Sequence, residues 1–268
     1  MGRNLLRAAV AAATTIASIV ASGGAASAED PIGDWKRAHD SDPHVRLTGQ
    51  DILALQAKQD AAKVRSLKRM QNARTAGAEY LHNNLSAIHQ AQQTSYWCGP
   101  AALVISLLNR NISMTQATAA TLMKTTQSAG TAWSGVNATV PSPTGYPMRD
   151  VYNYKLGYTE YFPLALPYSP TSADVTSFKY NLMDDIDRGF PVMGNAYEIV
   201  GGPHLPGHPN MLIFHWVNIR GYSYSATQTN ISDPAASPHV SWGANVPKFS
   251  SVDTAKMVRV MGGRGYVF

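Results

Sequence analysis

The chain has 268 residues, of which 44% are hydrophobic and 15% are charged, which is ordinary for a globular protein with a normal core. Its single cysteine excludes an internal disulfide. The formal net charge of +5 is too mild to indicate nucleic-acid binding, and it predicts at most a loose association with an anionic cell wall.

Residues 1–28 have the pattern of a secretory signal peptide. Arg3 and Arg7 make a positive start, residues 5–20 are an apolar, alanine-rich run, and Ala26-Ser27-Ala28 supplies a small-residue cleavage site. The run is shorter than the roughly 20 residues of a membrane span, and no other segment is apolar enough to form one. We therefore expect a secreted protein with no integral membrane span after cleavage.

Residues 29–87 are expected to form a helical N-terminal extension. The first part, to about residue 46, is polar and indicates a loose lead-in. Thr48 is a suitable N-cap, and apolar residues then recur at steps of three and four, which predicts an amphipathic helix over residues 50–74. Its remaining positions are rich in Lys and Arg, as on a solvated face. We expect this helix to dock on the main domain; the alternative is an inhibitory pro-segment that covers the functional site.

Residues 88–268 are expected to form one α+β domain, because helical patterns come first and strand-like segments follow. Between residues 130 and 171 the chain is rich in Gly, Pro, Ser and Tyr, so we expect loops and one strand near 157–162. The predicted helices cover residues 98–108, 113–124 and 172–188. The predicted strands cover residues 190–200, 212–222, 229–232 and 257–268.

The single cysteine is placed at the start of a helix. Cys98 is followed by Gly99 and Pro100, and then by an apolar run to Leu108. Proline is tolerated in a first helical turn, so the spacing predicts a helix that begins at Cys98. The helix dipole and free N–H groups stabilise a thiolate at that position. The flanking residues therefore favour a reactive thiol over an inert core thiol.

A thiolate nucleophile needs a base and an orienting partner. Of the eight histidines, His215 lies in the strongly β-forming segment 211–219, where a sheet would hold it rigidly. Asp233 ends the next predicted strand, so a hairpin would bring its carboxylate to the second ring nitrogen. The structural alternatives are a hydrogen-bonded core histidine and a simple Asp-Pro turn.

Acyl transfer also needs hydrogen-bond donors for the negative oxygen of its tetrahedral intermediate. The backbone N–H of Cys98 supplies one donor. Gln92 and Gln93, six and five residues earlier, are candidates for the second, and their structural alternative is an ordinary polar loop.

Other motifs are weaker. His204 and His208, together with Asp184, Asp185 or His239, could supply the side chains of a metal site. However, residues 201–209 are rich in Gly and Pro, which predicts a flexible loop near the mouth of the site. The chain contains no HExxH or CxxC, no phosphate loop and no dinucleotide fingerprint. We therefore expect no metal, no cofactor and no nucleic acid.

Taken together, these segments resemble the bacteriocin-processing double-glycine peptidases and their exported bacterial relatives, within the papain-like cysteine peptidases. The similarity rests on the Gln92-to-Cys98 spacing, Tyr96-Trp97-Cys98-Gly99-Pro100-Ala101, Gly189-Phe190-Pro191-Val192, His215-Trp216-Val217 through Gly221-Tyr222, and Asp233-Pro234.

The resemblance implies a papain-like α+β fold, with N-terminal helices packed on an antiparallel sheet. It implies Cys98 as nucleophile, His215 as base, Asp233 as the third member and Gln92 as oxyanion donor. We expect a secreted cysteine hydrolase that cleaves peptide or other amide bonds of a peptide or protein substrate through an acyl-enzyme. The alternative is a catalytically silent papain-fold module that binds a partner or associates with the cell wall.

Overall fold

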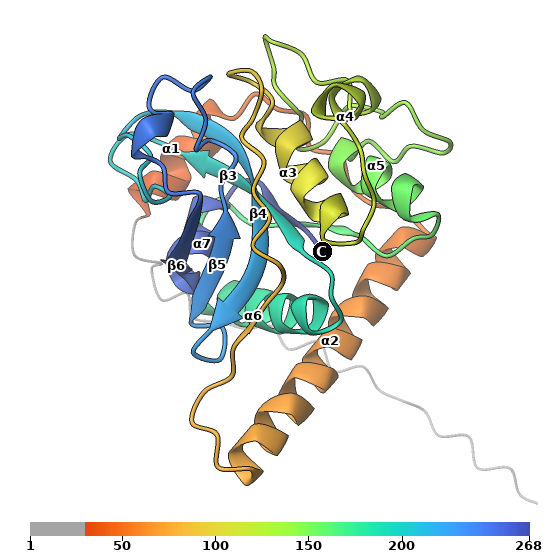
Figure 1. Cartoon of the computed structure of the whole chain (residues 1–268), viewed down its shortest axis with the longest axis vertical. Helices are drawn as coiled ribbons and strands as arrows, with labels where there is room; N and C mark the ends of the chain where they lie inside the picture. Colours follow the sequence, from red (N-terminus) through yellow and green to blue (C-terminus); the bar gives the residue numbers. More distant parts are fainter. Residues whose placement is uncertain (1–29) are drawn as a thin grey trace, which may run out of the picture.

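The computed structural model describes residues 30–268, so the predicted signal peptide lies outside the described residues. Helices cover both faces of one antiparallel sheet (Figure 1), which confirms the predicted α+β class with helices packed on an antiparallel sheet. The helices are α1 (Pro31–His39), α2 (Gln50–Thr75), α3 (Cys98–Leu108), α4 (Gln116–Leu122), α5 (Pro147–Leu156), α6 (Ser172–Asp187) and α7 (Thr254–Val260). Within residues 30–268, no helix is long and apolar enough to cross a bilayer.

The sheet has seven strands in the order β2-β7-β3-β4-β5-β6, with β1 pairing to β4. The longest strand, β4, pairs with β3 along its first half and with β5 along its second half. Because β4 pairs with both β3 and β5, residues at the ends of these three strands can lie close together. The strands are β1 (Asn83–Asn84), β2 (Pro163–Ala165), β3 (Val192–Glu198), β4 (Ile213–Ser223), β5 (Gln228–Ser232), β6 (Phe249–Asp253) and β7 (Gly265–Val267).

Each face of the sheet has its own hydrophobic core. Because successive residues of a strand point to opposite faces, Trp216 packs with α3 and α5, whereas Val217 packs with α6 and α7. Helix α3 is buried from Cys98 to Leu107, which explains why, apart from Ser106, this segment is apolar all round rather than on one face.

The N-terminal extension is more ordered than the sequence predicts. Helix α1 occupies part of the expected loose lead-in, with Pro31 at its first position. Its Lys36 is buried and donates hydrogen bonds to the carbonyls of Arg259 and Gly262, at 3.1 and 3.0 Å. These distant partners, rather than local propensity, stabilise α1. Helix α2 follows as predicted, except that its N-cap is Gly49 and not Thr48.

Helix α2 docks on α6, as predicted. Lys58 lies 3.2 Å from Asp185, and Arg65 donates to Asp184 at 2.7 Å. Part of the basic face is therefore paired with acidic residues of α6, where the sequence predicts a solvated face. The acidic residues come too late in the chain for a local pattern to reveal this pairing.

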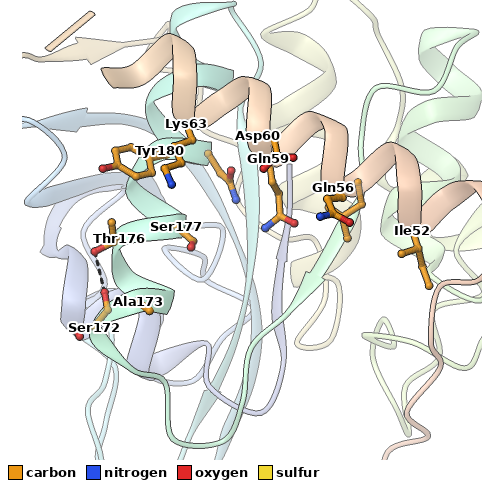
Figure 2. Close-up of a pocket in the computed structure, with 12 residues that line it drawn as sticks. Ile52, Gln56, Gln59, Asp60, Lys63, Ser172, Ala173, Thr176, Ser177 and Tyr180 are labelled. Atoms are coloured by element: carbon orange, nitrogen blue, oxygen red, sulfur yellow. Dashed lines mark hydrogen bonds between the residues drawn. The ribbon is translucent and has the colours of Figure 1, made fainter. Parts of the chain in front are cut away.

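A groove of about 660 Å³ separates these two helices (Figure 2). Gln56 and Gln59 of α2 face it from one side, and Ser177 and Tyr180 of α6 lie along the other. The groove is lined by no cysteine or histidine of the described residues, so it lacks the groups that the predicted chemistry requires.

Two predictions for the later chain are wrong. Residues 147–156 form helix α5 where loops were expected, although Pro147 at its start and Gly157 at its end, with φ of 80°, are ordinary helix signals. The single strand expected over 257–268 is instead α7 followed by β7, and β6 precedes them. Asp253 caps α7 by accepting from the N–H of Lys256 at 2.8 Å.

Candidate active site

Cys98 is the first residue of α3, and Pro100 lies in the first turn, as predicted. Figure 1 shows the chain running beside β4 before it enters this helix. The cysteine is 8% exposed and contributes to the wall of a cleft. The backbone N–H groups of Gly99 and Trp216 are near enough to the sulfur to lower the pKa of the thiol. The helix start thus places the sulfur beside the central strand β4.

His215 and Asp233 meet across neighbouring strands, as the predicted hairpin requires. His215 lies near the start of β4, and Asp233 follows the end of β5, which pairs with β4. Nε2 of His215 lies 2.8 Å from Oδ1 of Asp233, and both side chains are buried. The imidazole of His215 is close enough to Cys98 for the two groups to shift each other's pKa, and Nδ1 is the ring nitrogen not used by Asp233.

The electrostatics of this cluster favour charge separation between the sulfur and the imidazole. Burial alone would raise the pKa of Cys98, but the hydrogen bond and the positive charge of His215 outweigh burial and lower it. Burial alone would lower the pKa of His215, but the charge of Asp233 raises it well above its ordinary value. Burial alone would raise the pKa of Asp233, yet the charge of His215 holds the carboxyl pKa far below its usual range. A thiolate–imidazolium pair is the state that these shifts favour.

Of the two glutamines, Gln92 lies in the cleft and Gln93 does not. Gln92 and Cys98 line the same cavity, whereas Gln93 is exposed outside it. The backbone of Gln92 is fixed by Pro234, whose carbonyl accepts its N–H at 3.0 Å. Its Nε2 donates to the carbonyl of Thr94 at 2.8 Å, and a second amide hydrogen remains for another acceptor.

The cleft has a volume of about 340 Å³ and is built from four stretches of chain. Three of the lining residues, Met211, Leu212 and Phe214, are apolar and between 45% and 49% exposed. The cleft therefore combines a buried polar cluster with an apolar wall that is open to solvent. It is lined by Gln92, Ser95, Tyr96, Cys98, Ser128, Ala129, Gly130, Met211, Leu212, Ile213, Phe214, His215, Val240, Ser241 and Trp242.

Two further residues complete the buried cluster, and sequence reasoning did not assign them to it. Nε2 of His208 lies 3.1 Å from Oδ2 of Asp233, and Nδ1 of His208 lies 2.8 Å from Oε1 of Glu198. Glu198 ends β3 and is fully buried. The sequence did contain a signal for this cluster: Glu198 lies in a largely apolar predicted strand, and a buried acid needs a buried partner.

The segment 201–209 is anchored rather than loose. Leu205 lies in the core formed with α6, and His208 is buried in the polar cluster. The expectation of a flexible loop is therefore wrong at these positions, because the contacts that hold the loop come from β3 and from the end of β5. Gly and Pro content indicated a turn-rich path but gave no information on these contacts.

Of the metal-type residues considered from sequence, His204 and His208 meet at Glu198, but Asp184 and Asp185 do not join them. His204 Nδ1 lies 2.7 Å from Oε2 of Glu198, whereas Asp184 and Asp185 pair with the cations of α2. Among the described residues, one trio has ligand-type atoms within 4.8 Å of one another: His208, His215 and Asp233. Hydrogen bonds within the cluster already account for these atoms.

Comparison with curated protein sequences gives no match. Among solved structures, a C39-like peptidase from Bacillus anthracis is 14% identical with a TM-score of 0.44, covering 70% of this chain and 96% of its own. The peptidase domain of Streptococcus ComA, a bi-functional ABC transporter, is 17% identical with a TM-score of 0.39, covering 67% and 94%. Xylellain, a cysteine protease from Xylella fastidiosa, is 13% identical with a TM-score of 0.37, covering 71% and 86%. We draw no residue roles from these distant similarities.

The profile of the Peptidase_C39 like family matches residues 82–252. The match includes Cys98, His215 and Asp233, together with the strands that carry the last two. It covers well over half of the chain and agrees with the resemblance seen in the sequence motifs. The chain belongs to the Peptidase_C39 like family.

Proposed function

We propose that this protein is a cysteine peptidase in which Cys98 is the nucleophile, His215 the general base and Asp233 the residue that orients the imidazole. The observation that carries the proposal is that Cys98 at a helix start and His215 line one cleft, with a buried carboxylate of Asp233 2.8 Å from the imidazole. An inert core thiol does not need a histidine partner, and a structural histidine does not need a thiol.

In the proposed reaction, the Cys98 thiolate attacks the carbonyl carbon of a peptide bond, and the electron pair of the C=O bond moves to oxygen. The resulting oxyanion accepts hydrogen bonds from the backbone N–H of Cys98 and the free amide hydrogen of Gln92. His215 then gives its Nδ1 proton to the leaving amine as the C–N bond breaks, leaving a thioester.

A water molecule completes the cycle. His215, now neutral, takes a proton from this water as its oxygen attacks the thioester carbonyl. Collapse of the second tetrahedral intermediate releases the carboxylic acid product and restores the thiolate–imidazolium pair. Throughout, Asp233 holds the ring by its Nε2–H and stabilises its positive charge.

An extended peptide suits the cleft as substrate. Met211, Leu212 and Phe214 offer exposed apolar surface beside the catalytic cluster, where apolar side chains of a peptide would be removed from water. We propose that these residues contact the substrate near the bond that is cleaved. Profiling with a random peptide library tests this, because a preference that Phe214→Ser does not alter would contradict it.

The proposal includes export and a two-part mature chain. Residues 1–28 support a signal peptide by composition, and a mild excess of basic residues supports loose attraction to an anionic cell wall. We propose that residues 29–87 form a helical extension of a peptidase domain at residues 88–268. The basic helix α2 does not line the cleft, which supports a structural role for it.

Labelling with a fluorescent electrophilic probe tests the function. Wild-type protein should be labelled, Cys98→Ala should not, and His215→Gln should be labelled much more slowly. Tryptic mapping should place the label on the only cysteine of the chain. Labelling of the wild type no faster than that of the His215→Gln variant would contradict the proposal and favour a catalytically silent module.

A further inference from the structure

We propose that His208 is a positioning residue of the active site, which holds the Asp233 carboxylate in register with His215 and is itself held by Glu198. This inference rests on the proposed function of Cys98, His215 and Asp233. It adds two buried residues, from β3 and from the β3–β4 connection, to a site whose other parts come from α3, β4 and the end of β5.

Acidic side chains and histidines alternate in one series of hydrogen-bonded side chains. From the sulfur outward, His215 meets Oδ1 of Asp233 at 2.8 Å, and Oδ2 of the same carboxylate meets His208 at 3.1 Å. His208 continues to Oε1 of Glu198 at 2.8 Å, and Oε2 of Glu198 meets His204 at 2.7 Å. The side chains of His208, Asp233 and Glu198 are all at most 1% exposed.

The hydrogen-bond inventory indicates the role of His208. Both of its ring nitrogens face carboxylate oxygens, which accept but do not donate when ionised, so both nitrogens carry hydrogens whenever Asp233 and Glu198 are ionised. Burial would lower the pKa of His208, but its hydrogen bonds to Asp233 and Glu198 outweigh burial and raise it. A second imidazolium beside Asp233 is thus consistent with its surroundings.

Other charged or titratable groups also face His208 and Asp233. The ring of His215 lies 5.2 Å from the ring of His208, centroid to centroid, so its positive charge opposes protonation of His208. His89 contacts the backbone carbonyl of Asp233 at 2.9 Å, from the segment before α3. Trp242 covers His208 on a further side, at 4.6 Å between ring centroids, and adds no charge.

The hydrogen bond from His208 to Oδ2 of Asp233 also fixes the position of Oδ1, the oxygen that contacts His215. The backbone N–H of Ala235 also donates to Oδ1 at 2.8 Å, so one oxygen already serves two donors while the other depends on His208 alone among side chains of residues 30–268. Without His208, the carboxylate can turn about its last bond and loosen its contact with His215. Displacement of a catalytic group by about 1 Å can cost on the order of 100-fold in rate.

A matched pair of substitutions isolates this contact. His208→Gln places an amide nitrogen near the position of Nε2 and can still donate to Asp233, whereas His208→Phe keeps a ring against Trp242 without any donor. Both variants lose the same hydrogen bond to Glu198, so that loss cancels in the comparison. Each protein is first titrated with an electrophilic probe to count active sites, and kcat and KM are then measured for a fluorogenic peptide taken from library profiling.

We expect His208→Phe to lower kcat roughly 10- to 100-fold, with KM changed less than about twofold, and His208→Gln to recover most of that loss. Equal kcat per active site in both variants, whether both match the wild type or both fall together, would overturn the inference. Failure of the wild type itself to react with the probe would instead refute the proposed function, and the two failures are therefore distinguishable.

Nitrogen NMR of histidine-labelled wild-type protein tests the same inference without relying on the Phe variant to fold. The signals of His208 are assigned by their loss in His208→Gln. We expect protons on both ring nitrogens of His208 near neutral pH. A ring nitrogen Nε2 without a proton at that pH would overturn the inference, because Asp233 would then receive no hydrogen bond from it.

Discussion

Replacement of Gln92 by alanine tests the oxyanion site in a way that separates transition-state stabilisation from thiol reactivity. In the proposed mechanism two donors serve the developing oxyanion: the Cys98 N–H at the start of α3, and the amide hydrogen of Gln92 that is not bonded to Thr94. Losing one of two such donors typically costs about 2.7–4 kcal/mol, which corresponds to a kcat reduction on the order of 100- to 1000-fold.

The assay pairs two reactions of the same sulfur. Hydrolysis of a fluorogenic peptide passes through a tetrahedral oxyanion, whereas alkylation by iodoacetamide is a direct displacement at carbon and forms none. We expect Gln92→Ala to lower kcat for peptide hydrolysis on the order of 100- to 1000-fold. Its alkylation rate should stay within about threefold of the wild type, since an oxyanion donor acts only on hydrolysis.

Gln93→Ala is the matched control, because Gln93 is the neighbouring residue of the same type but is exposed outside the cleft. It should retain both reactions. Removing the Gln92 side chain also leaves the carbonyl of Thr94 without this donor, for which we expect a stability loss of about 1 kcal/mol by urea unfolding. Equal losses of hydrolysis and alkylation in Gln92→Ala would refute the reasoning, because they would indicate a damaged thiolate rather than a lost oxyanion donor.

Three further predictions follow from the charges of the described residues. Because the pKa of Cys98 is lowered and that of His215 is raised, alkylation should stay fast below the ordinary cysteine pKa of about 8.5, and His215→Gln should abolish this acidic plateau. The native pKa of Asp233 lies below its unfolded value, so its stabilising contribution is full above about pH 4 and is lost as pH falls; urea unfolding of Asp233→Asn should therefore depend less on pH in acid. Arg264→Met leaves Asp40 buried without its cation and should cost about 3–5 kcal/mol of stability, whereas a loss below about 1 kcal/mol would show that the N-terminal segment is not an integral part of the fold.

The positions of Cys98, His215 and Asp233 could be predicted from local sequence because these residues lie at or near the ends of helices and strands. Pro100 marks the first turn of α3 and so fixes where Cys98 lies in the helix. The β-forming run around His215 and the turn after Asp233 likewise define the ends of two neighbouring strands. Such boundary signals depend on a few adjacent residues, which a single sequence displays.

What could not be predicted depends on partners far away in the chain. Helix α1 is short and is stabilised through Lys36, whose acceptors are the carbonyls of Arg259, Val260 and Gly262, more than 220 positions later. His208 likewise acquires its role only when the strand that ends in Glu198 is placed beside it. Local periodicity carries no information on such pairings, and the glycine-rich surroundings of His208 indicated a free loop instead.

The central claim is that the sulfur of Cys98 is ionised against the imidazole of His215 in the resting protein. The most direct measurement is the ultraviolet absorbance of the thiolate, taken as the difference between the wild type and Cys98→Ser across a pH series. We expect the thiolate signal to be already present near pH 6 and to be lost in His215→Gln at that pH. A signal that emerges only near the ordinary cysteine pKa of about 8.5, with or without His215, would contradict it.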